Sequence, residues 1–296
     1  MIRALSVAFL LLAAPPLAAD TLRELSRTIW AGEDERLGGL SGMLLSEDGT
    51  EIIAVSDRGV LFEGRLERSG DEARLVRVTT VQSAALQTPR GTPLGRFAID
   101  GEGMTRAPDG GFYITFEAEH RLRYYPGFGQ RARPRPAHQD FARLQNNSGL
   151  EALASGADGI VYAIPERSGA LDRPFPVYRF DGTRWDVPFT VPRRPPFLPV
   201  GADIGPDGRL YLLERDFQML GGFATRLRRF EIGSDELFGE ATLLETRFGT
   251  LDNMESISIW RGPDGRLRVL MLADDNFNLF QRNLLVEFVI EDDLSN

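Results

Sequence analysis

Short apolar runs recur along the chain, and each follows an Asp-Gly pair. The pairs begin at Asp48, Asp109, Asp158, Asp207 and Asp264, and the runs that follow are residues 52–55, 112–116, 160–164, 210–213 and 269–272. Apolar segments on both sides of an Asp-Gly pair are the strongest short-range signal for a β-hairpin. The runs do not alternate with polar residues, so we expect strands that are covered on both faces.

Weaker strands with alternating polar and apolar residues lie between the hairpins, for example at residues 61–66 and 226–232. Four strands in a repeat of about 50 residues is typical of a β-propeller blade. The pattern therefore predicts an all-β fold, a propeller with five blades, or six if one long spacing conceals a degenerate blade. The fifth repeat shows only three strands, and we expect residues 22–29 to supply its outer strand. A ring closed by an N-terminal strand leaves no free edge.

The first nineteen residues have the features of a secretory signal peptide. A basic start at Arg3 precedes an apolar run at residues 4–14, which is too short to span a bilayer, and Ala18-Ala19-Asp20 resembles a processing site. We therefore expect residues 20–296 to form a single propeller domain located in the periplasm or secreted. The chain has no cysteine, so no disulfide contributes to its stability.

The charged residues narrow the range of partners. The formal net charge is −9, and all 34 basic residues are arginine. This composition excludes a Schiff-base or P-loop lysine, argues against nucleic acid or stable membrane insertion, and favours cations. Residues 121–136 are basic and aromatic, and we expect them to form a solvated loop outside the blades. We expect a monomer.

Carboxylates stand at the open ends of three of the predicted hairpins. If each turn is centred on its Asp-Gly pair, the facing residues are Glu102 and Glu117, Glu151 and Glu166, and Glu255 and Asp274. Like charges placed directly opposite each other destabilise a sheet, so such pairs need a cation, an arginine or a shared proton. By the same register Arg215 faces Val200. A bulged turn would shift the facing by one residue.

Only oxygen chemistry remains as a basis for catalysis or metal binding. The two histidines, His120 and His138, and the absence of cysteine argue against a zinc site and against a Ser-His-Asp triad. The open ends of all hairpins lie at one rim of a propeller, so the carboxylates should converge on one mouth of the central channel. Ca²⁺ accepts six to eight oxygen ligands with flexible geometry. The alternative is a structural ring in which arginines such as Arg58, Arg167 and Arg215 neutralise the acids.

A series of short motifs between Gly38 and Ile290 resembles one known family. They are Leu40-Ser-Gly-Met, Val55-Ser-Asp-Arg-Gly, Asp100-Gly-Glu-Gly-Met, Gly149-Leu-Glu-Ala-Leu, Leu213-Glu-Arg-Asp, Asn253-Met-Glu-Ser-Ile and Asp274-Asp-Asn. In their order they resemble the phytase-like domain family, also described as esterase-like activity of phytase. The resemblance implies a β-propeller that hydrolyses phosphoesters or esters. Calcium-dependent propeller phytases hold calcium with carboxylates and phosphate with basic residues, a role that falls to arginine here.

These observations predict an exported propeller that binds Ca²⁺ and hydrolyses a small anionic substrate such as a phosphate ester. The predicted metal ligands are Asp57, Glu102, Glu151, Glu255 and Asp274, and the predicted catalytic residues are Arg58, Arg215 and Glu166. The two arginines would neutralise the transferred phosphoryl group. Two alternatives are a metal-dependent hydrolase similar to the sugar lactonases, and a binding or scaffold propeller of the cell envelope without catalysis.

Overall fold

The computed structural model describes residues 21–95, 98–145, 148–278 and 281–291. The predicted signal peptide lies outside these ranges, so it stays a prediction. The described residues contain no helix that is both long and apolar enough to cross a membrane.

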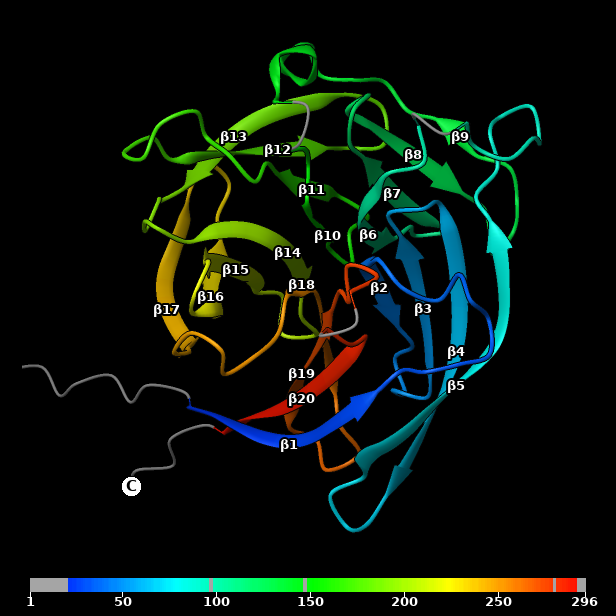
Figure 1. Cartoon of the computed structure of the whole chain (residues 1–296). Helices are drawn as coiled ribbons and strands as arrows, with labels where there is room; N and C mark the ends of the chain where they lie inside the picture. Colours follow the sequence, from blue (N-terminus) through cyan, green and yellow to red (C-terminus); the bar gives the residue numbers. More distant parts are fainter. Residues whose placement is uncertain (1–20, 96–97, 146–147, 279–280, 292–296) are drawn as a thin grey trace, which may run out of the picture.

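The described residues form five four-stranded sheets around a central axis, which confirms the five-bladed propeller (Figure 1). The first blade contains β2 (Leu40–Leu45), β3 (Glu51–Ser56), β4 (Val60–Ser69) and β5 (Arg74–Ala85). The second contains β6 (Gly101–Arg106), β7 (Phe112–Phe116), β8 (Arg121–Tyr125) and β9 (Arg133–Pro134). The third contains β10 (Ala152–Ser155), β11 (Val161–Ile164), β12 (Phe175–Phe180) and β13 (Trp185–Val191), preceded by the 3₁₀ helix η1 (Gln139–Arg143).

The last two blades complete the ring. The fourth contains β14 (Leu198–Ile204), β15 (Leu210–Gln218), β16 (Gly222–Ile232) and β17 (Leu237–Glu245). The fifth contains β18 (Met254–Arg261), β19 (Leu267–Ala273), β20 (Leu284–Glu291) and, as its outer strand, β1 (Thr21–Ile29). The pairing of β1 with β20 confirms the predicted closure by the N-terminal strand.

One prediction about the second blade was wrong. Residues 121–136 do not form a loop outside the blades, because Arg121–Tyr125 is β8 and Arg133–Pro134 is β9. The basic side chains of this segment alternate with buried Leu122 and Tyr124, which pack into the core. The many arginines of this segment led to the prediction of a solvated loop, although residues 121–125 form a strand with one apolar face.

The hydrophobic core consists of five clusters, each located between two neighbouring blades. The cluster between the fifth and first blades joins Trp260 and Leu270 to Ile52 and Phe62, and the next, between the first and second blades, joins Val55 to Phe116. Both faces of the middle strands therefore contact apolar side chains, as their uninterrupted apolar runs predicted. A sheet covered on both sides by its neighbours holds its inner strand rigidly at the channel.

Small residues allow the inner strands to approach one another. A Cβ atom added to Gly103 on β6 would lie 2.5 Å from the backbone oxygen of Glu151, the residue that precedes β10. A Cβ on Gly201 would lie 2.8 Å from the backbone oxygen of Glu255 on β18. The recurring small residue in each inner strand is thus a packing requirement, because only a side chain of minimal size fits there.

Candidate functional site

Each inner strand carries one residue that is displaced from regular pairing and lies at the channel. In β2, β6, β14 and β18 the register of pairing with the second strand shifts at this position, and in the third blade the same residue lies just before β10. Such β-bulges leave one residue unpaired and change the direction of its side chain. We call these positions the inner tier: Ser41, Glu102, Glu151, Val200 and Glu255.

A second set of five equivalent positions lies at the end of the second strand of each blade. Each of these residues pairs through its backbone with the residue that lies two positions before the inner-tier residue of the same blade. The backbone N–H of Glu117 donates to the carbonyl oxygen of Asp100, that of Glu166 to Gly149, and that of Asp274 to Asn253. Asp57 donates to Gly39 in the same way, and Arg215 pairs with Leu198. We call these positions the outer tier: Asp57, Glu117, Glu166, Arg215 and Asp274.

The two tiers correct the predicted register. In the second, third and fifth blades the Asp-Gly hairpins close as three-residue loops, in which the glycine has a positive φ, for example +88° at Gly110. This turn shifts the facing by one residue, as the bulged alternative predicted. The bulge at the inner tier adds a second shift, so Glu102 does not face Glu117, and Arg215 faces Leu198 instead of Val200. Glu151 and Glu166, and Glu255 and Asp274, are likewise not cross-strand partners.

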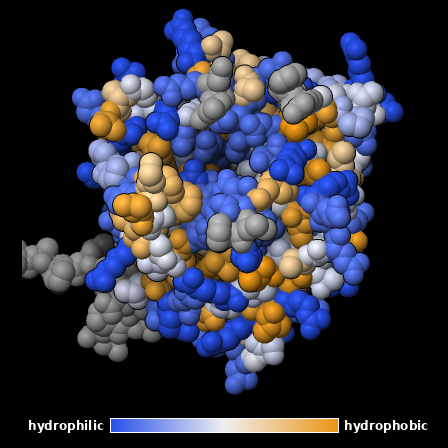
Figure 2. Space-filling view, viewed as in Figure 1, coloured by the Kyte–Doolittle hydropathy of each residue, from blue (hydrophilic) through white to orange (hydrophobic). Residues whose placement is uncertain are grey.

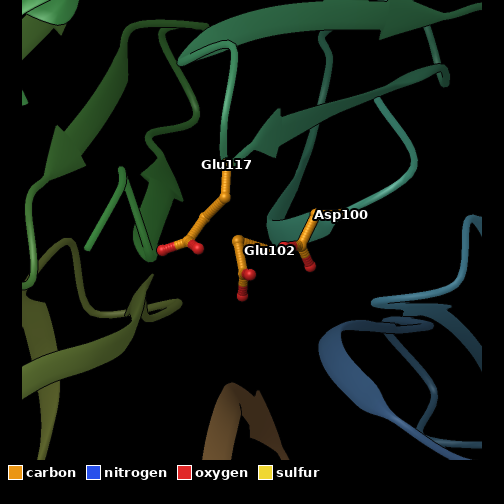
Figure 3. Close-up of side chains that lie close together, drawn as sticks. All are labelled: Asp100, Glu102 and Glu117. Carbon is orange, nitrogen blue, oxygen red and sulfur yellow. The ribbon is translucent and has the colours of Figure 1, made fainter. Parts of the chain in front are cut away.

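Three carboxylates of the second blade nevertheless converge. Asp100, Glu102 and Glu117 offer one oxygen atom each, and these atoms all lie within 4.8 Å of one another. Their side chains extend from neighbouring segments into the same space (Figure 3). Burial, with the nearby charges of Glu151 and Asp100, raises the pKa of Glu102 well above its usual range. Burial also raises the pKa of Glu117 to about 7, although its carboxylate accepts a hydrogen bond of 2.9 Å from the N–H of Gly149.

The acids on the other side of the channel have one arginine among them. The Arg215 guanidinium donates to the Oε1 atom of Glu255 and to the side-chain oxygen of Asn253. Asn253 in turn donates to Glu255 at 2.8 Å. Glu151 has no ion pair to an arginine within the described ranges, and burial together with the charges of Glu166 and Glu255 raises its pKa well above its usual range. Arg215 therefore neutralises one inner-tier acid directly and leaves the others in excess.

The remaining outer-tier acids flank this cluster. Burial raises the pKa of Asp274 to about 7, with Glu255 and Asp57 adding to the effect. Burial, with a contribution from Asp100, raises the pKa of Asp57 to about 6. The Oδ1 atom of Asp57 is buried and has no hydrogen-bond partner among the described residues. The fourth outer-tier acid, Glu166, forms an ion pair, and its carboxylate lies 3.3 Å from Nε of Arg167.

Arg58 does not pair with the acid that precedes it. It is exposed, and its guanidinium carbon lies 3.1 Å from the centre of the Phe277 ring, in a cation–π arrangement. Phe277 is held in the β19–β20 connection by its own N–H, which donates to Asp275 at 3.0 Å. The same Asp275 oxygen accepts from the N–H of Gly39 at 3.0 Å. This loop thus fixes Arg58 at the rim of the mouth.

Beside the tiers lies a cleft of about 450 Å³, which the fourth blade borders. It is lined by Glu166, Arg167, Leu198, Arg215, Asp216, Phe217, Phe223, Asn253, Glu255 and Asn276. A larger cavity of about 580 Å³ lies at the other end of the inner strands. Of its two acids, Glu47 and Asp203, Asp203 accepts hydrogen bonds from the N–H groups of Ile204 and Ile259, at 2.9 and 2.7 Å. The smaller cleft is the one that joins the carboxylate tiers.

The structure places all eight predicted site residues around one mouth, in the inner tier, in the outer tier or, for Arg58, next to it. Two acids of the three-carboxylate group, Asp100 and Glu117, were not among the predicted ligands. Asp100 lies two positions before the inner tier, where the other blades have Gly39, Gly149, Leu198 and Asn253. If the repeats were aligned on the small residue of each inner strand, Asp100 would stand out as the acid among these five equivalent positions.

The donor set fits a hard divalent cation. The converging atoms are carboxylate oxygens, which Ca²⁺ prefers, and Asp57 contributes a buried oxygen without a partner among the described residues. Among the described residues, the converging group consists of carboxylates alone and contains neither the thiolate nor the imidazole that zinc prefers.

Comparisons with known proteins agree with this architecture. The family model described as phytase-like, esterase-like activity of phytase, matches residues 35–277. A comparison with the curated proteins finds no match.

Among solved structures, the α-L-arabinofuranosidase PaAbf62A from Podospora anserina, in complex with cellotriose, is similar in fold. Its TM-score is 0.53 at 12% sequence identity, covering 94% of this chain and 98% of that one. Virginiamycin B lyase from Staphylococcus aureus gives a TM-score of 0.45 at 11% identity, over 92% and 100% of the two chains. The calcium-binding protein regucalcin from Agrobacterium tumefaciens gives 0.44 at 13% identity, over 85% and 76%. At 12% identity, the likeness to the arabinofuranosidase supports the fold alone.

Proposed function

Because the chain belongs to the phytase-like family, we propose that it is a metal-dependent hydrolase that cleaves phosphate esters at the carboxylate tiers, with Ca²⁺ as its metal. The tiers contain seven acids and a single arginine, Arg215, among ten equivalent positions. Such an excess of buried like charge is unfavourable unless a cation or bound protons offset it.

The contrast with two structural glutamates carries the proposal. Glu214 is fully buried and accepts from Arg226 at 2.6 Å and from Arg228 at 3.0 Å. Glu287 is fully buried and accepts from Arg68 at 2.7 and 2.9 Å. At these two positions, where the acid serves the fold, the chain neutralises it with arginines. Within the described residues Glu102, Glu151 and Asp274 have no such ion pair, which favours a mobile cation as their partner.

In this proposal Asp57, Asp100, Glu102 and Glu117 hold the metal, with Glu151 and Asp274 beside them. Glu255 positions Arg215, because the two side chains form a hydrogen-bonded ion pair. Bound Ca²⁺ would polarise the phosphoryl group and lower the pKa of an attacking water. Arg215 faces the cleft and would bind a phosphoryl oxygen, while exposed Arg58 would bind another at the rim.

The departing alcohol oxygen must receive a proton. Glu117 is a metal ligand in this proposal, and a carboxylate that binds Ca²⁺ is ionised, so this proton would come from water. Glu166 borders the cleft and would orient the attacking water. Export stays a prediction, and it would bring the site into a compartment where calcium is more abundant than in the cytoplasm.

The test follows p-nitrophenyl phosphate hydrolysis by protein stripped with EDTA and then titrated with Ca²⁺. We expect turnover that requires Ca²⁺ and falls at least tenfold in Glu102→Gln, but not in Glu119→Gln. Glu119 is the matched control, because its exposed side chain belongs to neither tier. Opening of a sugar lactone without phosphatase activity would favour the lactonase alternative. Inertness toward both substrates would favour a binding propeller.

A further inference from the structure

The hairpin of β15 and β16 extends beyond its counterparts in the other blades. The second strand has nine residues in the fourth blade, but five in the second blade and four in the third. Its pairing with β16 continues past the outer-tier residue Arg215 through Asp216 and Phe217 to Gln218. The fourth blade therefore raises a two-stranded ribbon above the mouth of the channel.

This ribbon has an apolar face directed at the cleft. Phe217 and Phe223 form a cross-strand pair with ring centres 4.9 Å apart, and both line the cleft together with Leu198. Phe217 is 58% exposed, and Met219 and Leu220 at the tip are 89% and 101% exposed. Hydrophobic atoms gather over this hairpin, next to the hydrophilic hollow at the centre of the face (Figure 2).

The apolar face is continuous with the acidic mouth. The guanidinium carbon of Arg215 lies 5.5 Å from the ring of Phe223, while the same side chain bonds to Glu255. A ligand that reaches Arg215 with an anionic group would therefore place its next atoms against aromatic rings. Besides Arg215, the cleft has one further cation among its lining residues, Arg167, which belongs to the third blade and not to the ribbon.

We propose that the substrate is amphiphilic: a phosphate monoester of an alcohol with an alkyl or aryl group, which packs against Leu198, Phe217 and Phe223. This inference rests on the proposed function, because it names the substrate class of the same site. In the reaction water adds to phosphorus and the bond from phosphorus to the ester oxygen breaks. The alcohol leaves with one proton, and inorganic phosphate remains. A polyol that carries many phosphates would leave the apolar face uncovered and is disfavoured.

The test compares ethyl, butyl and octyl phosphate in Ca²⁺, below the micelle concentration, by release of inorganic phosphate. The scissile bond is the same in all three esters, so differences in kcat/KM report the contact that the alkyl group of the substrate makes with the protein. It should rise by up to about fourfold for each methylene that becomes buried. Phe217→Ala should reduce the octyl-to-ethyl ratio at least fivefold. Phe238→Ala should not, because Phe238 is similarly exposed, at 53%, on the outer strand β17 and does not line the cleft.

Calorimetric binding of octylphosphonate and ethylphosphonate, which cannot be hydrolysed, separates the two proposals. Tighter binding of octylphosphonate that Phe217→Ala abolishes supports the apolar site, even if no ester is turned over and the proposed hydrolase function fails. Equal binding of the two phosphonates, or a Phe217→Ala variant that retains the preference, overturns the inference, even if every ester is hydrolysed.

Discussion

Replacing Glu117 by glutamine tests the electrostatics of the site with one change. Burial raises the pKa of Glu117 from 4.5 to about 7, while the unfolded chain retains the ordinary value. Between these pH values the folded protein binds more protons than the unfolded protein, so its free energy of unfolding falls as pH rises. Glutamine removes this titration. It retains an oxygen that can accept from the N–H of Gly149, at the position where the carboxylate accepts at 2.9 Å.

The magnitude follows from the displacement of the pKa. In EDTA, the stabilisation by Glu117→Gln should be greater at pH 8 than at pH 5 by about 2.5 kcal/mol, since one pKa unit corresponds to about 1.4 kcal/mol. Urea denaturation of wild type and variant at both pH values measures this difference directly. Glu119→Gln controls for the lost charge alone, because the Glu119 side chain is 73% exposed, and it should change little.

Ca²⁺ should make the wild type more stable than Glu117→Gln, the reverse of their order in EDTA at pH 8. Ca²⁺ that binds only the folded wild type stabilises it by about 2.7 kcal/mol at a hundredfold excess over Kd, and Glu117→Gln should lose much of that gain. The reasoning is refuted if Glu117→Gln destabilises the protein equally at pH 5 and pH 8 in EDTA. That result would mean that Glu117 is held as an anion by the fold and is not repelled by its neighbours.

The other predictions concern the fold and the arginines. Glu287→Gln should lower the free energy of unfolding by about 3–5 kcal/mol in urea denaturation, since it removes the charge partner of Arg68 and one of the two carboxylates that pair with buried Arg268, which retains Asp264. Gly103→Ala should lower the melting temperature measured by circular dichroism, because its Cβ would lie 2.5 Å from a backbone oxygen. Arg215→Ala should lower both phosphatase activity and the melting temperature in EDTA, whereas exposed Arg58→Ala should lower activity alone; equal melting temperatures for the two variants would contradict this.

The sequence predicted the blades well, because blade formation depends on local patterns. Asp-Gly pairs, apolar runs of four to five residues and a period near 50 residues all express interactions within one hairpin. The closing strand β1 was predictable for a different reason, since a fifth blade with three strands leaves an edge that another segment must cover. The prediction of a loop at residues 121–136 was wrong because the apolar face of β8 has only a few residues and lies among many arginines.

The facing of the carboxylates could not be predicted, because it depends on two bulges whose effects add. The turn bulge is encoded by glycine at a positive φ, and a register centred on the Asp-Gly pair overlooks it. The bulge at the inner tier arises from packing between blades, where Gly103 contacts the backbone of Glu151 in the next blade. Convergence on one mouth was predictable all the same, since a shift of one or two residues does not move a side chain from one end of a hairpin to the other.

The fourth blade breaks the fivefold pattern at every level, and the departures favour one direction of substrate entry. Its inner-tier residue is Val200 instead of an acid or serine, and its outer-tier residue is Arg215, where the other four blades have acids. It also has the extended hairpin and borders the cleft that reaches Glu255. Within the tiers, the other blades present acids or serine to an anionic group, whereas the fourth blade presents Arg215 beside an apolar wall. The asymmetry of one blade thus gives a nearly symmetric ring of acids a single approach for an anion with an apolar tail.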